Sequence, residues 1–316
     1  MSRKLNTYLH MDLWKKLGII AALLVGSSLL IYSVTEPPTE NTTKKKIHNE
    51  YKIYALPIPE VMDFAGEPVP LDQPDIRERM DRELLVNAYW QSNGLLIFKR
   101  ANKYFPKIEA ILRENNLPED FKYLAVAESG LQDVVSPAGA AGFWQFMPAT
   151  AKEYGLEVNS YVDERYHLEL VTKAAAQYLH KAKDHFGSWT LAAAAYNAGR
   201  NGIGKQIERQ KAPRNYYDLL LNPETSRYMF RILAFKEIMA NPKGYGFHFN
   251  NSDLYHPIPV KKIKVDTSIE DLAEFAKEHG INYKILKIHN PWLRDTKLPN
   301  KSGKTYYIEI PEPGFY

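Results

Sequence analysis

One carboxyl, that of Glu128, occupies a sequence position that suits a general acid catalyst. The apolar residues Phe121, Leu124 and Ala125 recur at helical spacing, and Glu128 is the next position on the same face. Gly130 follows almost at once, and glycine ends helices readily because it adopts positive φ. The pattern predicts a carboxyl on the buried side of the last helical turn. Burial and the helix dipole both disfavour its ionisation, so it can stay protonated near neutral pH and act as a general acid.

Another interpretation of Glu128 is a carboxylate on the rim of the apolar stripe, paired with Lys122 or Arg113. The residues after the helix favour the catalytic interpretation. The segment SPAGAAGFWQFMP at 136–148 combines a Ser-Pro turn, two glycines around alanines, and one amide, Gln145, among aromatic residues. Backbone with so few side-chain atoms can approach a ligand closely.

Helical patterns run from residue 76 to about residue 245 and supply the elements that must hold Glu128. The predicted apolar faces consist of Leu84, Leu85, Ala88 and Tyr89; of Tyr104, Ile108, Ile111 and Leu112; and of Val171, Ala174, Ala175, Tyr178, Leu179 and Ala182. Further helices are predicted over 149–154 and 224–240. Residues 191–195 are small enough for close helix packing, and the sequence Tyr-Asn-Ala-Gly at 196–199 caps that helix. The fold class is therefore mainly α.

Composition excludes several kinds of protein. The 316 residues suffice for one substantial domain and a smaller one, and the net charge of +4 comes without a dense basic run, so nucleic acid is not an expected partner. The absence of cysteine excludes disulfides, thiolate metal sites and an anchor on a lipidated cysteine. His167, His180 and His185 lack the spacing of a zinc site, so we expect neither a metal nor another cofactor.

The N-terminus carries a predicted membrane segment. Residues 1–16 are short and basic, and residues 17–35 contain no Asp, Glu, Lys or Arg. About 20 apolar residues span a bilayer as a helix, whereas a signal-peptide core usually has about 7 to 15. We therefore predict an uncleaved transmembrane helix with its basic flank in the cytoplasm, with a cleaved signal peptide as the alternative. Residues 36–75 are rich in proline and charge, which is typical of an extended linker with little core.

The last segment, 256–312, changes character. VKKIKV predicts a strand, residues 267–270 look like a capping signal ahead of the helix in DLAEFAKEHG, residues 282–290 predict a second short helix, and KTYYIEIP predicts a closing strand. The order β-α-α-β resembles a LysM glycan-binding module. The usual Gly-Asp-Thr-Leu opening is here Asp-Thr-Ser-Ile at 266–269, so a structural appendage without sugar affinity is the alternative.

Several ordered motifs together resemble one enzyme family. The string ESGLQDVVSPAGAAGFWQFMPATAKEYGL, followed by VDERY, AAAQYL, FGSW and AAAAYNAGRNGI, is similar to the signature of the lytic transglycosylases of glycoside hydrolase family 23. The resemblance covers roughly residues 77–236. It implies a lysozyme-like all-α catalytic domain, placed here at 76–250, and peptidoglycan as the substrate.

The resemblance also implies a mechanism with one carboxyl. Most glycosidases use two carboxyls, but Asp133 lies in the following loop, where the sequence defines no geometry, and Asp163 is expected to pair with Arg165 and hold a loop in place. In the family, one Glu protonates the glycosidic oxygen between MurNAc and GlcNAc. The same Glu then removes the proton of the sugar's C6 hydroxyl, which closes a 1,6-anhydro ring without water. Glu128 matches that residue.

Other positions match family residues that bind the sugar. Ser136 matches the serine near the muramyl acetamido group, Gln145 and Met147 match residues that line the cleft, and Tyr196 and Asn197 match the wall near the catalytic Glu. The structural alternatives are a turn for Ser136, core packing for Met147 and a helix C-cap for Asn197.

Three functions follow as hypotheses. The leading one is a peptidoglycan lytic transglycosylase anchored to the inner membrane with its catalytic domain in the periplasm, or secreted there after signal cleavage. The second is a goose-type lysozyme, which is a hydrolase on a related scaffold. The third is a catalytically silent protein that binds the cell wall through its C-terminal module.

Overall fold

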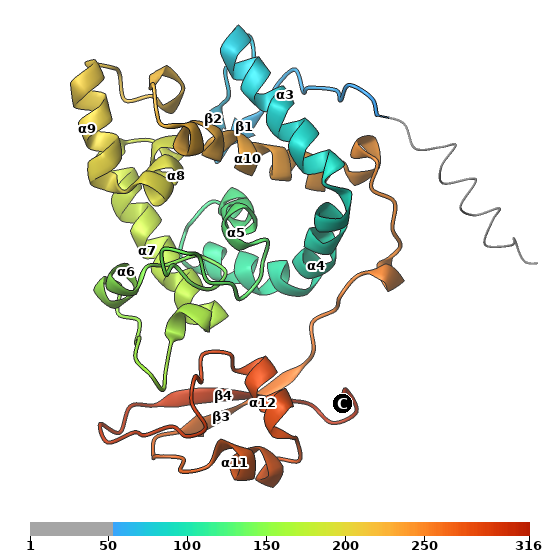
Figure 1. The fold of residues 1–316 in the computed structure, drawn as a ribbon, viewed down its shortest axis with the longest axis vertical. Coiled ribbons are helices and arrows are strands. Elements are labelled where there is room, and N and C mark those ends of the chain that lie inside the picture. The colour runs from blue at the N-terminus through green and yellow to red at the C-terminus, as the bar shows by residue number, and fades with distance from the viewer. Residues whose placement is uncertain (1–52) are drawn as a thin grey trace, which may run out of the picture. The chain divides into compact units, whose positions relative to one another are not determined.

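The computed structural model describes residues 53–316 and confirms a mainly helical protein with a small C-terminal strand pair (Figure 1). The helical part contains a short hairpin and eight α-helices: β1 (Asp63–Phe64), β2 (Glu67–Pro68), α3 (Pro74–Tyr89), α4 (Gln91–Glu114), α5 (Lys122–Ser129), α6 (Pro148–Glu153), α7 (Leu168–Phe186), α8 (Trp189–Ala198), α9 (Arg200–Gln210) and α10 (Pro223–Ala240). The C-terminal part comprises β3 (Val260–Val265), α11 (Leu272–Glu278), α12 (Tyr283–His289) and β4 (Tyr306–Pro311).

The predicted membrane segment at 17–35 and its basic flank at 1–16 lie outside the described residues. Within residues 53–316, no helix has the length and apolar character that crossing a bilayer requires.

The short helix α5 lies in the middle of the helical part, with longer helices around it (Figure 1). It packs against α4 and α10. The long helix α7 is amphipathic as predicted, begins at the N-cap His167, and ends where Gly187 takes φ 77°. Residues 191–195 of α8 are fully buried, and α8 packs on α7, because small side chains let two helices approach closely.

The N-terminal hairpin differs from the linker expected over 36–75. Met62, Phe64, Val69 and Leu71 are all buried in the main core, so this stretch belongs to the folded body. Glu67 explains why the hairpin is held there. Its carboxylate accepts the backbone N–H groups at 189 (2.5 Å) and 190 (2.9 Å), the free donors of the α8 N-terminus. The proline content concealed the apolar positions that make these contacts.

The buried face of α3 also differs from the prediction. Leu84 and Ala88 are buried as expected, whereas Leu85 is only partly buried. Glu83, 1% exposed, takes the place expected of an apolar side chain, because it meets Arg227 of α10 at 2.7 Å. A charged residue inside an apolar face cannot be foreseen from periodicity when its partner is distant in the chain.

Helix α9 was not predicted, because its apolar stripe is limited to Ile203 and Ile207 and because it contains two glycines, Gly202 and Gly204, which disfavour a helix. The 3-10 turn Glu119–Phe121 precedes α5, so the α-helix proper begins at Lys122.

The C-terminal part has the predicted β-α-α-β order. Strands β3 and β4 pair antiparallel, with Val260 opposite Pro311 and Val265 opposite Tyr306. The capping signal predicted at residues 267–270 is wrong. Asp271 is the N-cap of α11, and its carboxylate accepts the N–H of Ala273 at 2.7 Å.

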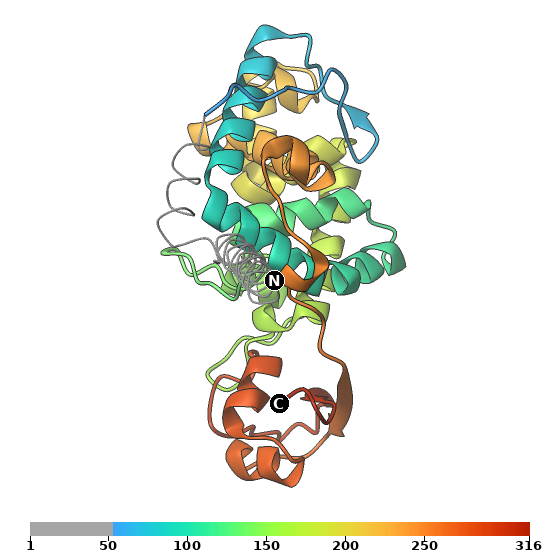
Figure 2. The same ribbon diagram turned by 90° about the vertical axis from the view of Figure 1, so that its right-hand side faces the viewer.

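This part contacts the loop 157–166 of the helical part. Lys304 bridges Glu157 (2.7 Å) and Glu164 (2.6 Å), and the N–H of Asp163 donates to the carbonyl of Trp292 (2.9 Å). The connecting segment 246–259 runs past α4, as Figure 2 shows in orange, and Phe98 packs against both of its phenylalanines. The two parts therefore share charged and backbone contacts.

Candidate active site

Glu128 sits in the last turn of α5, as the sequence predicts. Gly130 adopts the left-handed conformation (φ 58°) at the C-cap and ends the helix. The buried Ser129 hydroxyl donates to the carbonyl of Phe143 (2.9 Å) and accepts the N–H of Leu131 (3.1 Å). Ser129 therefore ties the helix end to the loop after it and holds the Glu128 backbone in place.

Burial raises the pKa of the Glu128 carboxyl to about 7. A hydrogen bond from Tyr228 and the positive charge of Arg231 lower it, and the carboxylate of Glu224 raises it further. The effect of burial exceeds that of Tyr228 and Arg231, so the pKa of Glu128 is raised overall. At neutral pH a large fraction of Glu128 is therefore protonated, while loss of the proton is also accessible, and both states are needed in acid–base catalysis.

Two tyrosines surround the carboxyl. The phenol of Tyr228, on α10, donates a hydrogen bond to Oε1 of Glu128. Tyr196, on α8, donates to the carbonyl of Trp144 at 2.6 Å. Burial, and next the negative charge of Glu128, raise the pKa of both phenols well above the usual value. Both therefore remain neutral and act as hydrogen-bond donors rather than as bases.

The loop after α5 is closed by its own polar side chains. The Ser136 hydroxyl accepts the N–H of Ala140 at 3.0 Å, which is the turn-forming role considered for this residue. The Gln145 amide donates to the carbonyls of Gly142 (2.8 Å) and Val134 (3.0 Å). Gln145 also takes a positive φ of 48°, which its side-chain bonds support.

The structure tests two structural alternatives: core packing for Met147 and a helix C-cap for Asn197. Met147 is 41% exposed, so it is not a core residue, whereas Phe146 is buried. Asn197 lies within α8, whose C-cap is Gly199, so the C-cap interpretation of Asn197 is wrong. Its Oδ1 accepts the hydroxyl of Thr225 at 2.8 Å and links α8 to α10.

Asp163 pairs with Arg165 at 2.7 Å, both side chains being 9% exposed, as predicted for a residue that pins a loop. Arg165 also donates to the carbonyls of Gly139 (2.8 Å) and Phe146 (3.1 Å). A Cβ on Gly142 would lie 2.1 Å from the carbonyl oxygen of Arg165. The glycine is therefore needed for close approach within the protein, between the 136–147 loop and residue 165.

The second carboxyl considered, Asp133, lines a separate cavity whose walls do not include Glu128. The histidines have structural contacts: His180 meets the carbonyl oxygen of Asn115 at 2.8 Å, and His167 caps α7. Across residues 53–316, no three His, Asp or Glu side chains are gathered in a way that would hold a metal ion.

Sequence reasoning missed Tyr228 and Arg231, the two groups on α10 that lower the pKa of Glu128. Tyr228 lies in the predicted helix 224–240 and is 2% exposed. The hydroxyl of a buried tyrosine usually has a hydrogen-bond partner, and this was the available signal. The identity of that partner depends on how α5 and α10 pack, which periodicity does not reveal.

The helical part and the C-terminal part each match a known domain. Residues 105–219 match the transglycosylase SLT domain, and residues 261–314 match the soluble lytic transglycosylase C-terminal LysM-like domain. The chain therefore carries an SLT transglycosylase domain followed by a LysM-like domain, as the resemblance in the motifs implied.

Individual proteins are also similar to this chain. The chain is 29% identical over 253 residues to membrane-bound lytic murein transglycosylase D of Escherichia coli (strain K12), and equally to the protein of that name in an Escherichia coli O6:H1 strain. The match covers 78% of this chain and 54% of the relatives, so the chain spans about half of their length. An inactive mutant of lytic transglycosylase Slt from Pseudomonas aeruginosa has a solved structure with a TM-score of 0.36 and 19% identity, over 49% of this chain and 26% of that one.

Proposed function

We propose that this protein is a peptidoglycan lytic transglycosylase that cleaves the β-1,4 bond between MurNAc and GlcNAc and leaves a 1,6-anhydro-MurNAc end. The observation that carries the proposal is the state of Glu128, a helix-end carboxyl whose pKa is raised to about 7 and which Tyr228 orients. The SLT domain at 105–219 and the relatives named lytic murein transglycosylase support it.

The chemistry uses Glu128 twice. The protonated carboxyl donates its proton to the glycosidic oxygen, and the bond from C1 of MurNAc to that oxygen breaks, which releases the 4-hydroxyl of GlcNAc. The C6 hydroxyl of the same MurNAc then forms a bond to C1, and its proton returns to the Glu128 carboxylate. The proton balance closes without water, and proximity of the internal hydroxyl favours ring closure.

The remaining predicted site residues receive roles consistent with their contacts. We propose that Met147, which is exposed, and the neutral phenol of Tyr196 contact sugar rings beside Glu128. Ser136 and Gln145 shape the loop backbone that faces the glycan, since their side chains already bond to that backbone. Asn197 acts through Thr225, by holding α8 to α10.

Product analysis tests the reaction. Purified protein is incubated with sacculi and the released muropeptides are measured by mass spectrometry. The proposal expects 1,6-anhydro ends. Reducing ends, one water heavier, would reject the transglycosylase in favour of the lysozyme-like hydrolase.

The variant Glu128→Gln tests the site. It is expected to abolish release while sedimenting with sacculi as the unchanged protein does. Sacculus binding without any turnover by the unchanged protein would instead support the silent scaffold. Lysis that survives in Glu128→Gln would remove Glu128 from the mechanism.

The location of the enzyme is proposed from the N-terminal sequence. We propose that residues 17–35 anchor the chain in the inner membrane and that the catalytic part and the LysM-like domain meet glycan strands in the periplasm, since the Escherichia coli relative is named membrane-bound. Fractionation followed by N-terminal sequencing tests this. A mature chain that begins after residue 35 would establish the alternative, secretion after signal cleavage.

A further inference from the structure

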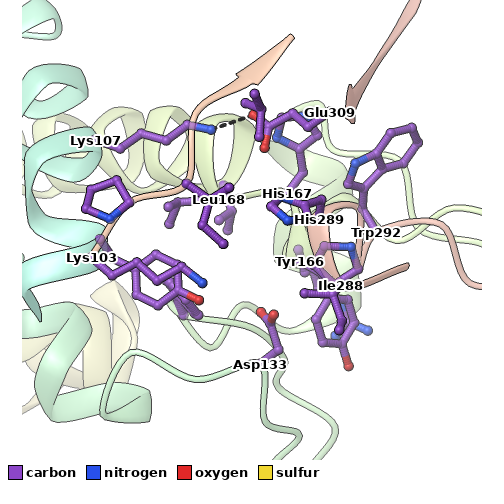
Figure 3. A pocket seen from close by; sticks show the side chains of 18 of the residues that line it. Lys103, Lys107, Asp133, Tyr166, His167, Leu168, Ile288, His289, Trp292 and Glu309 are labelled. Carbon is purple, nitrogen blue, oxygen red and sulfur yellow. Dashed lines mark hydrogen bonds and ion pairs between the residues drawn. The ribbon is translucent and has the colours of Figure 1, made fainter. Parts of the chain in front are cut away.

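A cavity of about 290 Å³ lies where the helical part meets the LysM-like part (Figure 3). Glu128 is not among the residues that line it. Its walls come from α4, the loop that follows α5, residues 165–168 at the start of α7, and the C-terminal part around α12. The volume is near the lower end of the range for small-ligand sites, about 300 Å³. It therefore fits one amino-acid residue with a short flank.

Two opposite charges face this cavity. Lys103 reaches in from α4 and Asp133 points in from the loop after α5 (Figure 3). Burial has the largest effect on the pKa of each group. Beyond burial, Asp133 raises the pKa of Lys103, while Arg294 and then Lys103 lower the pKa of Asp133. Among residues 53–316, neither Lys103 nor Asp133 belongs to an ion pair within 4.0 Å. Asp133 also keeps a solvent-exposed side.

The other charged groups in the cavity are already matched. Lys107 pairs with Glu309 at 2.7 Å, as the dashed line in Figure 3 marks, and Arg165 pairs with Asp163 at 2.7 Å. Burial lowers the pKa of His167 to about 4, so this imidazole is neutral at physiological pH. Lys103 and Asp133 are therefore the lining charges that have no ion-pair partner among residues 53–316. Arg294 does not line the cavity, but its positive charge also acts on Asp133 and lowers the pKa of that carboxyl.

Between these charges the walls are apolar and aromatic. Tyr104 packs edge-on against Phe143 with ring centroids 4.8 Å apart, and Trp292 and Ile288 face them from the C-terminal part. A ligand that suits the cavity therefore carries an ammonium and a carboxylate on a short aliphatic body. A ligand of a single charge would leave Lys103 or Asp133 unmatched in partly desolvated surroundings.

We propose that this cavity binds the zwitterionic end of a peptidoglycan stem peptide, with the ligand carboxylate on Lys103 and the ligand ammonium on Asp133. The choice of peptide rests on the proposed function. The glycan itself offers no ammonium because its amino sugars are N-acetylated, whereas a diamino acid in the stem has a free amine and a carboxylate on one carbon. Asp133 is five residues from Glu128, so one loop connects the two sites.

Binding of a free peptide tests the proposal directly. The probe is the tripeptide L-alanyl-γ-D-glutamyl-meso-diaminopimelate, titrated into the full-length protein in a calorimeter. We expect Lys103→Ala and Asp133→Asn each to weaken binding about tenfold or more, since each removes one charge-assisted contact. Lys205→Ala, an exposed lysine on α9, is the matched control and should bind as the unchanged protein does.

Acetylation of the diaminopimelate amine is expected to weaken binding as much as Asp133→Asn does. The proposal is overturned if the tripeptide does not bind, if the acetylated peptide binds equally, or if both variants retain full affinity. Circular dichroism and thermal unfolding establish that the variants fold.

The test of peptide binding can be distinguished from the test of the proposed transglycosylase reaction. Glycan strands stripped of stem peptides should still give 1,6-anhydro ends with Lys103→Ala and Asp133→Asn. Peptide binding without anhydro products would retain the cavity assignment and reject the reaction. Anhydro products without peptide binding would support the proposed reaction and reject the cavity assignment.

Discussion

The phenol of Tyr228 donates a hydrogen bond to Oε1 of Glu128 and so joins α10 to the last turn of α5. This bond favours the carboxylate, whereas burial favours the neutral acid, and the balance places the pKa of Glu128 at about 7. A carboxyl poised near neutrality exchanges its proton in both directions at low cost. The pair therefore sets both the direction of the carboxyl and its readiness to ionise.

Replacing Tyr228 with phenylalanine should shift the pH profile. Because the hydrogen bond lowers the pKa of Glu128, its loss raises that pKa further, by about one unit. The alkaline limb of kcat/KM, expected near pH 7 in the unchanged enzyme, should move to higher pH. The measurement is the pH dependence of anhydro-muropeptide release.

Tyr245→Phe is the control for that variant. Tyr245 also donates to a carboxylate, that of Glu237 at 3.1 Å, but outside the site, so its loss should leave the alkaline limb in place. A limb that stays near pH 7 in Tyr228→Phe would contradict the role given to this bond.

Glu128→Gln should change how stability depends on pH. The raised pKa means that the folded state binds the proton more tightly than the unfolded chain, so stability is greatest below the unfolded pKa of about 4.5 and falls as the pH rises to about 7. Glutamine does not ionise, so the variant does not lose stability in this way as the pH rises. From pH 4 to pH 8, Glu128→Gln should therefore gain stability relative to the unchanged protein by about 1–3 kcal/mol.

Denaturant unfolding at the two pH values measures this difference. Glu208→Gln, on the exposed side of α9, should show a much smaller change. Equal pH dependence in the Glu128 and Glu208 variants would mean that Glu128 is not desolvated.

Glu83→Gln should destabilise the fold. Its buried carboxylate holds Arg227 at 2.7 Å and has Arg231 at 3.9 Å, so α3 is joined to the helix that carries Tyr228. Arg82 also pairs with Glu83, so loss of the charge leaves three guanidinium groups without their buried partner, although they also reach solvent. We expect a loss of about 1–3 kcal/mol in the free energy of unfolding.

Asp75→Asn, at an exposed pair on the same helix, should cost less than about 0.5 kcal/mol. Chemical denaturation of both variants gives the comparison. An equal cost for the two would show that the Glu83 contacts contribute no more than a surface pair.

Gly142→Ala should damage the loop that follows α5. The added Cβ would meet the carbonyl oxygen of Arg165 at 2.1 Å, at a residue whose φ is 77°, so backbone has to move. The expected cost is about 2–4 kcal/mol, with a large loss of activity because this loop adjoins Glu128. Thermal unfolding and product release measure the two effects.

Gly155→Ala separates backbone strain from the clash. Gly155 has a similar φ of 82° but open space where a Cβ would stand, so only the strain of about 1 kcal/mol is expected. Similar losses at the two positions would show that the contact with residue 165 is unimportant.

Much of the fold follows from local sequence patterns. The helix that ends at Gly130, the amphipathic α7, the alanine-rich α8 and the β-α-α-β order of the C-terminal part were all predicted, since periodicity and capping act over a few residues. The hairpin at 63–68 and the helix α9 were not, because prolines stand among the apolar positions around the hairpin and α9 has only a short apolar stripe.

The position of Glu128 was therefore determined by the sequence itself: an apolar face that reaches a carboxyl one turn before a glycine. The tertiary structure decided what surrounds that carboxyl. Tyr228 and Arg231 come from a helix about one hundred residues later, and Arg231 in turn lies 3.9 Å from Glu83 of a helix 45 residues before Glu128. Ionisation depends on burial and on charges through space, and these are properties of packed helices rather than of neighbouring letters in the chain.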